Sequence, residues 1–175
     1  VMRHTPFSPQ GVHSNGYSLI RYVLKKRKID LKNDIFLKKE LALEVKSDPK
    51  ILVNDQSIKN SKLRYKMNNE EINILLGIGG SGSTKRVPAK IFIEVMNLIT
   101  QKHKCKFFLA TGKNIEEQKI LHEILSTKYK DKCYALDHLS LNDILPIIKN
   151  CNISICNDSS FSHLSSGLGI KTIVL

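Results

Sequence analysis

The sequence predicts an α/β fold from about Glu71 onward, with a Rossmann-like parallel sheet flanked by helices. In this region short apolar segments alternate with longer segments of helical periodicity, the pattern of parallel strands joined by crossover helices. Residues that favour helix ends stand beside several of the helical segments. The length of 175 residues leaves room for one such domain and an extension.

Strands and helices are expected in strict alternation. The expected strands are Ile72–Ile78, Cys105–Thr111, Lys132–Leu136, Asn152–Cys156 and Lys171–Leu175. The expected helices are Pro88–Lys102, Ile115–Lys128, Leu141–Lys149 and Ser159–Leu168. Because helices follow strands throughout, the strands should run parallel within one sheet.

Local signals mark several of the helix ends. Asn114 is suited to cap the second helix, and Ser140 with Asp143 resembles a capping box before the third. Gly169 is placed to end the last helix. Pro146 should kink or shorten the third helix, because its ring removes one internal hydrogen bond.

The residues before the sheet, 1–66, are predicted to form a partly irregular connection between domains, and 67–175 a separate domain. Gly16–Lys28 has helical spacing and a basic end, whereas Asp30–Lys66 is polar and lysine-rich, as expected of a linker with one or two edge elements. The chain opens on Val and stops inside an expected strand, which indicates a fragment of a longer protein.

The composition limits the classes of partner. The net charge is +12, from 28 Lys and Arg against 16 Asp and Glu, and such a surface attracts phosphorylated ligands, nucleic acid or an anionic membrane face. A generally lysine-rich composition would produce the same charge. The chain lacks interleaved aromatic residues and any nucleic-acid-binding motif, so no nucleic acid partner is expected.

Neither a membrane span nor a metal site is expected. The longest apolar runs, Ile144–Ile148 and Ile173–Leu175, are too short to cross a bilayer, and the first residues lack a secretory signal. The four cysteines form no C-x-x-C pair and have no matching histidine spacing. Reduced thiols in the core are therefore expected, which favours a cytoplasmic protein.

A glycine-rich loop, GIGGSGSTKR over Gly77–Arg86, follows the first strand. It matches G-x-G-x-x-G, but a dinucleotide-binding loop would put Pro88 inside a helix, and no acidic residue follows the second strand. The order G-S-T-K also differs from the G-K-[ST] of a P-loop. What remains is a diphosphate cradle of loop amides closed by Thr84, Lys85 and Arg86, or a plain turn with incidental cations.

The segment CNDSSFSHLSSGLG, over Cys156–Gly169, joins the fourth strand to a short helix. Asp158 or Ser159 is suited to cap that helix, whose first amide groups would point toward an anion. His163 lies one turn into the helix. The alternative is that these residues only cap the helix and that His163 packs in the core.

The strand order expected for a doubly wound sheet, 3-2-1-4-5, places the first and fourth strands side by side. The loops Ser81–Lys85 and Asn157–Ser160 would then meet at the topological switch point, where such sheets bind ligands. Thr111–Glu117 would flank the same crevice. Glu117, ahead of Glu116, could accept hydrogen bonds from ribose hydroxyls, or could only favour the start of its helix.

On these residues the chain resembles the family 9 glycosyltransferases, the lipopolysaccharide heptosyltransferases. GIGGSGSTKRVP is similar to the family's G-x-x-x-x-x-K-R-W-P loop, with Val87 in place of the tryptophan. NDSSFSHLSSGLGIKTIVL is similar to D-T-G-x-x-H-L-A-A-A-L-G and the strand after it. The resemblance runs from about Glu71 to Leu175, and GVHSNGYSLIRYVLKKRKID resembles the family's connection between domains.

The resemblance implies the C-terminal, donor-binding half of a GT-B glycosyltransferase. Such an enzyme transfers a sugar from a nucleotide donor, typically ADP-heptose, to the lipopolysaccharide core, without a metal or other cofactor. Implied partners are the nucleotide-sugar and the lipopolysaccharide or another glycan acceptor, with an anionic membrane surface as a further candidate. The implied location is the cytoplasm, peripheral at the inner face of the inner membrane.

Carried over position by position, the resemblance assigns eight residues to donor binding: Ser83, Thr84, Lys85, Glu117, Asp158, Ser159, Ser160 and His163. Asp158 is expected to cap the helix and orient the loop amides, because a carboxylate does not attract phosphate. Ser160 replaces a glycine of the family pattern.

The family's catalytic base lies in the acceptor-binding half, which precedes the matched region. No catalytic residue is therefore assigned here, and the fragment alone is not expected to catalyse transfer. The alternative reading is a noncatalytic nucleotide-binding or assembly module on a degenerate form of the same fold.

Overall fold

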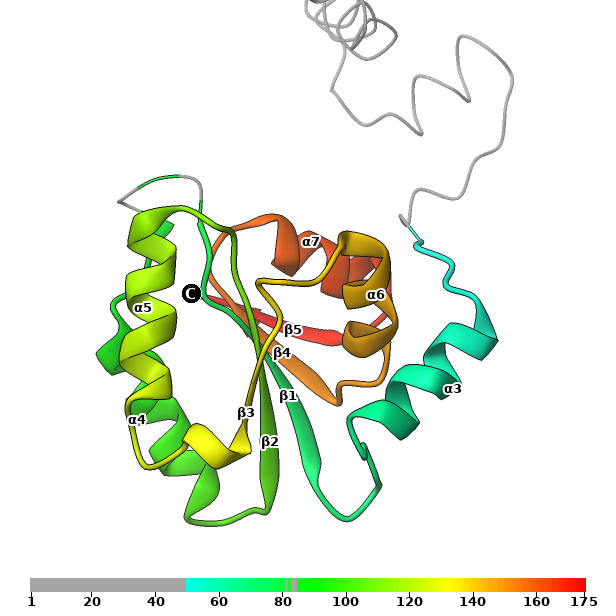
Figure 1. Cartoon of the computed structure of the whole chain (residues 1–175), viewed down its shortest axis with the longest axis horizontal. Helices are drawn as coiled ribbons and strands as arrows, with labels where there is room; N and C mark the ends of the chain where they lie inside the picture. The colour runs from blue at the N-terminus through cyan, green and yellow to red at the C-terminus, as the bar shows by residue number, and fades with distance from the viewer. Residues whose placement is uncertain (1–49, 81, 83–84) are drawn as a thin grey trace, which may run out of the picture. The chain divides into compact units, whose positions relative to one another are not determined.

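A five-stranded parallel sheet lies at the centre of the structure, a computed structural model that describes residues 50–80, 82 and 85–175. The spatial order of the strands is β3-β2-β1-β4-β5, which confirms the predicted order (Figure 1). The strands are β1 (Ile72–Gly77), β2 (Cys105–Ala110), β3 (Cys133–Ala135), β4 (Ile153–Cys156) and β5 (Lys171–Val174). Each begins and ends within a residue or two of its predicted bounds.

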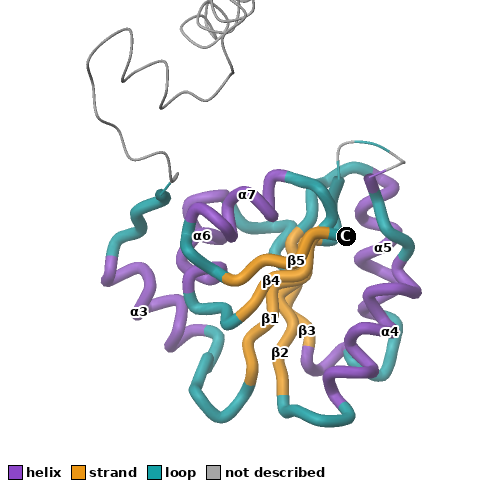
Figure 2. The backbone as a smooth tube through the Cα atoms, turned by 180° about the vertical axis from the view of Figure 1, so that it is seen from behind, coloured by secondary structure: helices purple, strands orange, loops and turns teal. Residues whose placement is uncertain are grey.

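Helices cover both faces of the sheet (Figures 1 and 2). On one side lie α4 (Ala89–Thr100) and α5 (Ile115–Leu125), and on the other lie α6 (Leu141–Lys149), α7 (Ser160–Gly167) and the first described helix, α3 (Asp55–Arg64). A short 3-10 helix, η3 (Lys130–Lys132), precedes β3. The predicted arrangement of a parallel sheet between helices is confirmed.

Two apolar layers form because successive side chains of a strand point to opposite faces. Ile74 and Leu76 of β1 pack with Phe92 of α4, whereas Leu75 packs in the other layer with Ile147 of α6. All five side chains are buried. Burial on both faces explains the nearly continuous apolar sequence of the central strands.

The register aligns the carboxyl ends of the three central strands. Gly77, the last residue of β1, pairs with Ala110 of β2 and with Cys156 of β4. A Cβ atom on Gly77 would lie 2.5 Å from the Cys156 sulfur, so no larger residue fits between these strands. The loops that follow β1, β2 and β4 therefore leave the sheet at one edge, the upper edge in Figure 1.

The predicted helix signals are confirmed at several ends. The Asn114 side chain accepts the Glu117 amide at 2.9 Å at the start of α5, and Ser140 caps α6 through the Asp143 amide. Gly169, at φ 76°, ends α7, and the amide of Ile170 bonds the Ser165 carbonyl, a Schellman arrangement.

Of the two effects predicted for Pro146, shortening is wrong, because α6 keeps its full predicted length, and the kink stays a prediction. The Pro146 carbonyl is well satisfied, since it accepts from the Ser61 hydroxyl at 3.1 Å and from the Asn150 amide at 2.9 Å.

Helix α3 lies within the predicted extension, residues 1–66, for which no helix at this position was predicted. Asn54 caps it, and α3 packs on α6 through polar contacts, including the Asn150 amide on the Ile58 carbonyl at 2.9 Å. Residues 55–64 of the predicted extension therefore contact the domain, and the predicted boundary between 66 and 67 stays a prediction. The remainder of the predicted extension, with the helix expected over Gly16–Lys28, lies outside the described residues. The functional roles predicted for 1–66 and 67–175 stay predictions.

All four cysteines are free thiols in or near the core, as predicted. Cys105, Cys151 and Cys156 are buried, and Cys133 is half-buried. Burial raises the pKa of all four, that of Cys133 to about 12, so they stay protonated at neutral pH. Among the helices that the structure describes, none combines the length and the apolar character required to cross a bilayer.

Candidate functional site

A crevice lies at the carboxyl edge of the sheet, where the loops after β1, β2 and β4 meet. It encloses a cavity of about 370 Å³, and its walls come from all three loops: Gly79, Gly80, Gly112, Glu117, Ser159, Ser160 and Phe161. The expectation that the loops after β1 and β4 would lie together is therefore confirmed. The backbone is close to the surface of this cavity because three of the wall residues have no side chain.

Asn157, directly after β4, connects the loop after β4 to the glycine-rich loop after β1. It is fully buried, its amide nitrogen donates to the Ile78 carbonyl at 2.9 Å, and its side-chain oxygen accepts the Val87 amide at 3.2 Å. Its own backbone amide donates to the Gly77 carbonyl at 2.9 Å. One side chain thus fixes both ends of the glycine-rich loop against the end of β4.

Sequence reasoning placed Asn157 in the loop but did not assign it a role. The sequence does contain a signal for this role. An amide side chain directly after a buried strand is suited to bond the backbone groups that lose their partners where the strand ends.

Glu117 fixes the other side of the crevice. Its side chain is buried, with 6% of the residue exposed, although it is a carboxylate. One oxygen, Oε1, accepts the Gly80 amide at 2.8 Å, and the other lies 3.5 Å from the Thr111 hydroxyl. A Cβ atom on Gly112 would overlap Oε2, so a larger residue at 112 would displace the carboxylate from this position.

This contact restricts what Glu117 and the glycine-rich loop can offer to a ligand. The Gly80 amide is already bonded to Glu117, so it is not a donor for an anion in this state. The Arg86 guanidinium donates to the Gly80 carbonyl at 3.3 Å and completes the turn. Ser83 and Thr84, both assigned to donor binding by the resemblance, lie outside the described residues.

An ion pair links the loops after β1 and β4, next in sequence to the wall residue Ser159. Lys85 Nζ lies 2.6 Å from Asp158 Oδ2, and the side chains are 48% and 52% exposed. The hydrogen bond and the positive charge of Lys85, with a smaller contribution from His163, hold the pKa of Asp158 below its usual range.

The predicted capping role of Asp158 is wrong, because its carboxylate bonds Lys85 instead. Ser159 occupies the N-cap position of α7 but makes no side-chain cap, and its buried hydroxyl has no partner among the described residues. Helix α7 consequently begins without a side-chain cap. The amides of such a first turn are suited to an oxyanion.

Ser160 and His163 lie in the first turn of α7 and are both exposed. The alternative that His163 packs in the core is therefore wrong. Phe161, between them in sequence, is half-buried and packs against the apolar layer that contains Leu75. This contact anchors the start of α7 beside β1.

Taken together, the crevice has the properties of an anion site. It combines an uncapped helix start, a flexible primary amine and close backbone approach at glycines. No group of three metal-ligating side chains occurs within the described residues.

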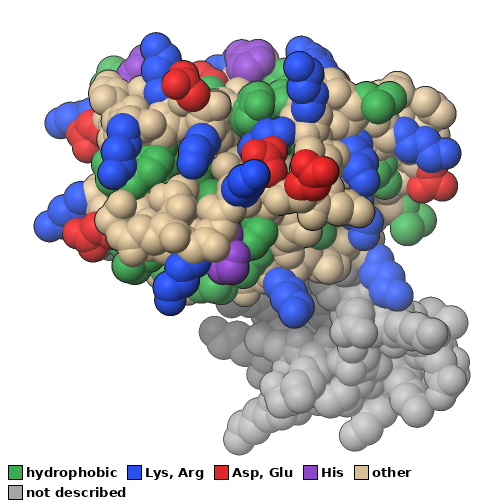
Figure 3. Space-filling model, turned by 90° about the horizontal axis from the view of Figure 1, so that it is seen from below, with side chains coloured by type: hydrophobic (Ala, Val, Ile, Leu, Met, Phe, Trp, Pro, Cys, Tyr) green, Lys and Arg blue, Asp and Glu red, His purple; other side chains and the backbone are tan. Residues whose placement is uncertain are grey.

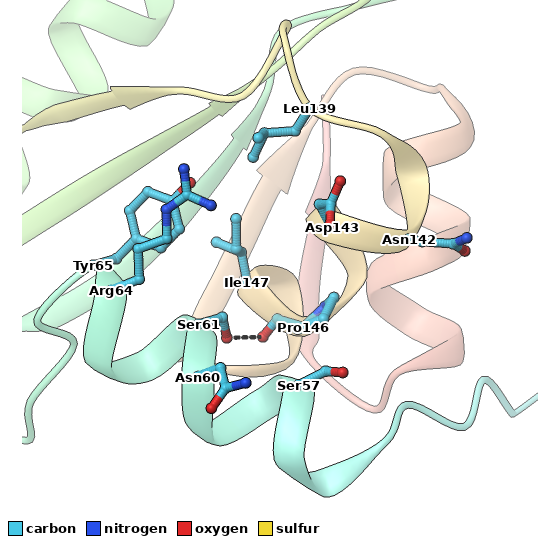
Figure 4. A pocket seen from close by; sticks show the side chains of 10 residues that line it. All are labelled: Ser57, Asn60, Ser61, Arg64, Tyr65, Leu139, Asn142, Asp143, Pro146 and Ile147. Carbon is cyan, nitrogen blue, oxygen red and sulfur yellow. Dashed lines mark hydrogen bonds between the residues drawn. The ribbon is translucent and has the colours of Figure 1, made fainter.

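A second cavity, of about 220 Å³, lies between α3 and α6 (Figure 4). Its lining residues include Ser57, Asn60 and Arg64 of α3 and Asn142 and Asp143 of α6. It shares no lining residue with the crevice and lies against the outer helix rather than at a switch point.

The positive charge of the chain is not concentrated on the face seen in Figure 3. Lys and Arg side chains are spread over that face, and Asp and Glu side chains lie among them. A dispersed charge of this kind does not mark a particular binding surface there.

Comparisons with known proteins agree with this geometry. The model of the family described as "Glycosyltransferase family 9 (heptosyltransferase)" matches residues 24–175. No curated protein sequence matches the chain.

Among solved structures, E. coli ADP-heptose lps heptosyltransferase II is similar with a TM-score of 0.61 at 19% identity, over 72% of this chain and 39% of that one. A family 9 glycosyltransferase of Veillonella parvula DSM 2008 is similar with a TM-score of 0.58 at 17% identity, over 71% and 36%.

E. coli heptosyltransferase WaaC with ADP-2-deoxy-2-fluoro heptose is similar with a TM-score of 0.53 at 14% identity, over 63% of this chain and 34% of that one. At these identities the likeness concerns the fold. The chain spans less than two fifths of the length of each of these three enzymes.

Proposed function

Because the chain belongs to glycosyltransferase family 9, we propose that its crevice binds the diphosphate of a nucleotide-sugar donor. The supporting observation is the meeting of the glycine-rich loop, with Lys85, and the uncapped start of α7 at the switch point of the sheet. Parallel α/β sheets bind ligands in this position.

The proposed donor is ADP-heptose. One similar structure, of WaaC, contains an ADP-heptose analogue, and another is an ADP-heptose lipopolysaccharide heptosyltransferase. The proposed reaction is transfer of the heptose to the lipopolysaccharide core at the inner face of the membrane. An acceptor-binding half that carries the catalytic base would be required, so this chain alone is not expected to transfer sugar.

The proposed roles follow from the charge that develops in the reaction. When the sugar–phosphate bond breaks, the departing nucleoside diphosphate gains negative charge. The amides of the first turn of α7 and the Lys85 amine would stabilise that charge without a metal, and His163 would add to it when protonated. Ser159 and Ser160, at the cavity wall, would contact the phosphates.

Glu117 has one oxygen, Oε2, that no backbone amide occupies among the described residues. In this proposal Oε2 accepts a ribose hydroxyl while Oε1 holds Gly80. Thr84 and Ser83 are proposed to contact the donor on the resemblance alone.

Isothermal titration calorimetry with ADP and UDP tests the proposal. We expect ADP to bind, and Lys85→Ala to weaken binding about tenfold, because a hydrogen bond from a cation to phosphate is lost. Lys130→Ala is the matched control, since Lys130 is exposed in η3 at the opposite edge of the sheet. Failure of ADP to bind at millimolar concentration, or equal affinity in both variants, would contradict the proposal.

A further inference from the structure

Asp158 is a carboxylate in a place where an anion is expected to bind. It immediately precedes the N-cap residue of α7, and its Oδ2 takes the Lys85 amine at 2.6 Å. Lys106 and Glu71 form a second, less exposed ion pair, at 2.9 Å, at the opposite edge of the sheet. Of these two Lys–carboxylate pairs in the described part of the chain, only the first lies at the crevice.

The fold gives little reason for the carboxylate at 158. It caps no helix, its only hydrogen-bond partner among the described residues is Lys85, and half of its side chain is exposed. Exposed pairs of this kind contribute little to stability. A function in binding therefore explains Asp158 better than a structural one.

Its charge has a definite consequence for ligands. The Lys85 amine has one carboxylate partner within 2.6 Å, and a phosphate that uses this amine has to compete with that partner. The negative charge of Asp158 also opposes a second anion at the start of α7. His163 is the other ionisable group that acts on Asp158 in this region, and its positive form stabilises the carboxylate.

We propose that Asp158 is an internal counter-anion of Lys85, which a ligand phosphate must displace, and that it thereby sets the affinity and selectivity of the crevice. The inference rests on the proposed function. In the unliganded protein the pair connects the loops after β1 and β4. A ligand whose phosphate does not reach Lys85 leaves the ion pair intact and gains no binding free energy from the Lys85 amine.

A competing role for Asp158 predicts the opposite change in phosphate affinity when the carboxylate is removed. If the carboxylate orients Lys85 toward the ligand and remains bonded to it, removal of the carboxylate weakens phosphate binding. If it is a counter-anion, removal strengthens binding.

The test is calorimetric titration of the full chain with ADP and with AMP, using Asp158→Asn and, as the matched control, Glu71→Gln from the other ion pair. We expect Asp158→Asn to bind ADP about threefold to tenfold tighter at low salt, and the gain to shrink as salt screens the charge. The gain for AMP should be smaller, and Glu71→Gln should leave both affinities unchanged.

A double-mutant cycle tests whether Asp158→Asn changes ADP affinity through Lys85. In a Lys85→Met background the Asp158→Asn gain for ADP should largely disappear, because the amine for which the two anions compete is absent. An undiminished gain in that background would overturn the counter-anion role, as would equal or weaker ADP binding by the single variant. Wild-type and Asp158→Asn chains that both fail to bind ADP would instead overturn the proposed function, and this inference with it.

Discussion

Two pairs of polar side chains at the crevice differ in burial. Glu117 and Asn157 are buried and bond backbone groups at 2.8 and 2.9 Å. Lys85 and Asp158 are half-exposed charges that bond only each other among the described residues. Buried polar contacts are expensive to disturb, whereas exposed ion pairs exchange partners easily. The first pair thus fixes the shape of the site, and the second is free to respond to a ligand.

The largest effect is expected at Asn157. Replacement by Leu leaves the Ile78 carbonyl and the Val87 amide without their partner, and should lower the free energy of unfolding by about 2–4 kcal/mol. Chemical denaturation measures this. Asn150→Leu is a useful comparison, because it removes amide contacts to α3 rather than at the crevice, and it should leave ADP affinity unchanged. A stable Asn157→Leu chain with unchanged ADP affinity would show that Asn157 does not fix the glycine-rich loop.

A smaller effect is expected at Glu117. Glu117→Ala frees the Gly80 amide and should cost about 1–2 kcal/mol in unfolding free energy, whereas Glu117→Gln keeps an oxygen acceptor and should recover part of it. Gly112→Ala should be destabilising only while the carboxylate is present, because its Cβ would overlap Oε2. Equal costs of Gly112→Ala with and without Glu117 would contradict this explanation.

The exposed pair should affect titration more than stability. The pKa of Asp158 is lowered in the folded state, so its small stabilising contribution is present above its ordinary value of 3.8 and is lost as the pH falls through the lowered pKa. Lys85→Met should move this pKa back toward 3.8, and Lys130→Ala should not. Side-chain carboxyl NMR titration measures both, and an unchanged Asp158 pKa in Lys85→Met would show that the pair does not form in solution.

The same contrast explains which features could be predicted from the sequence. The strands and helices from Ile72 onward were predictable because their periodicity and caps, such as Asn114, are local signals. Helix α3 was missed because it is polar and is held by hydrogen bonds to α6 rather than by an apolar stripe.

The other differences between prediction and structure depend on residues that are far apart in the sequence. The local context of Asp158 favours capping, but Lys85, 73 residues earlier in the chain, takes its carboxylate instead. The burial of Glu117 depends likewise on Gly80, which is 37 residues away. Such contacts follow from the register of the sheet, which brings Gly77 beside both Ala110 and Cys156 and is not readable from any one segment.

Chemical-shift mapping of the backbone amides during an ADP titration tests the location of the donor site most directly. The proposed site predicts the largest changes at Gly79, Ser160 and Phe161, on the crevice wall, and none at Asn60 or Arg64 beside the second cavity. Changes concentrated around α3 and α6, with the crevice amides unmoved, would contradict it.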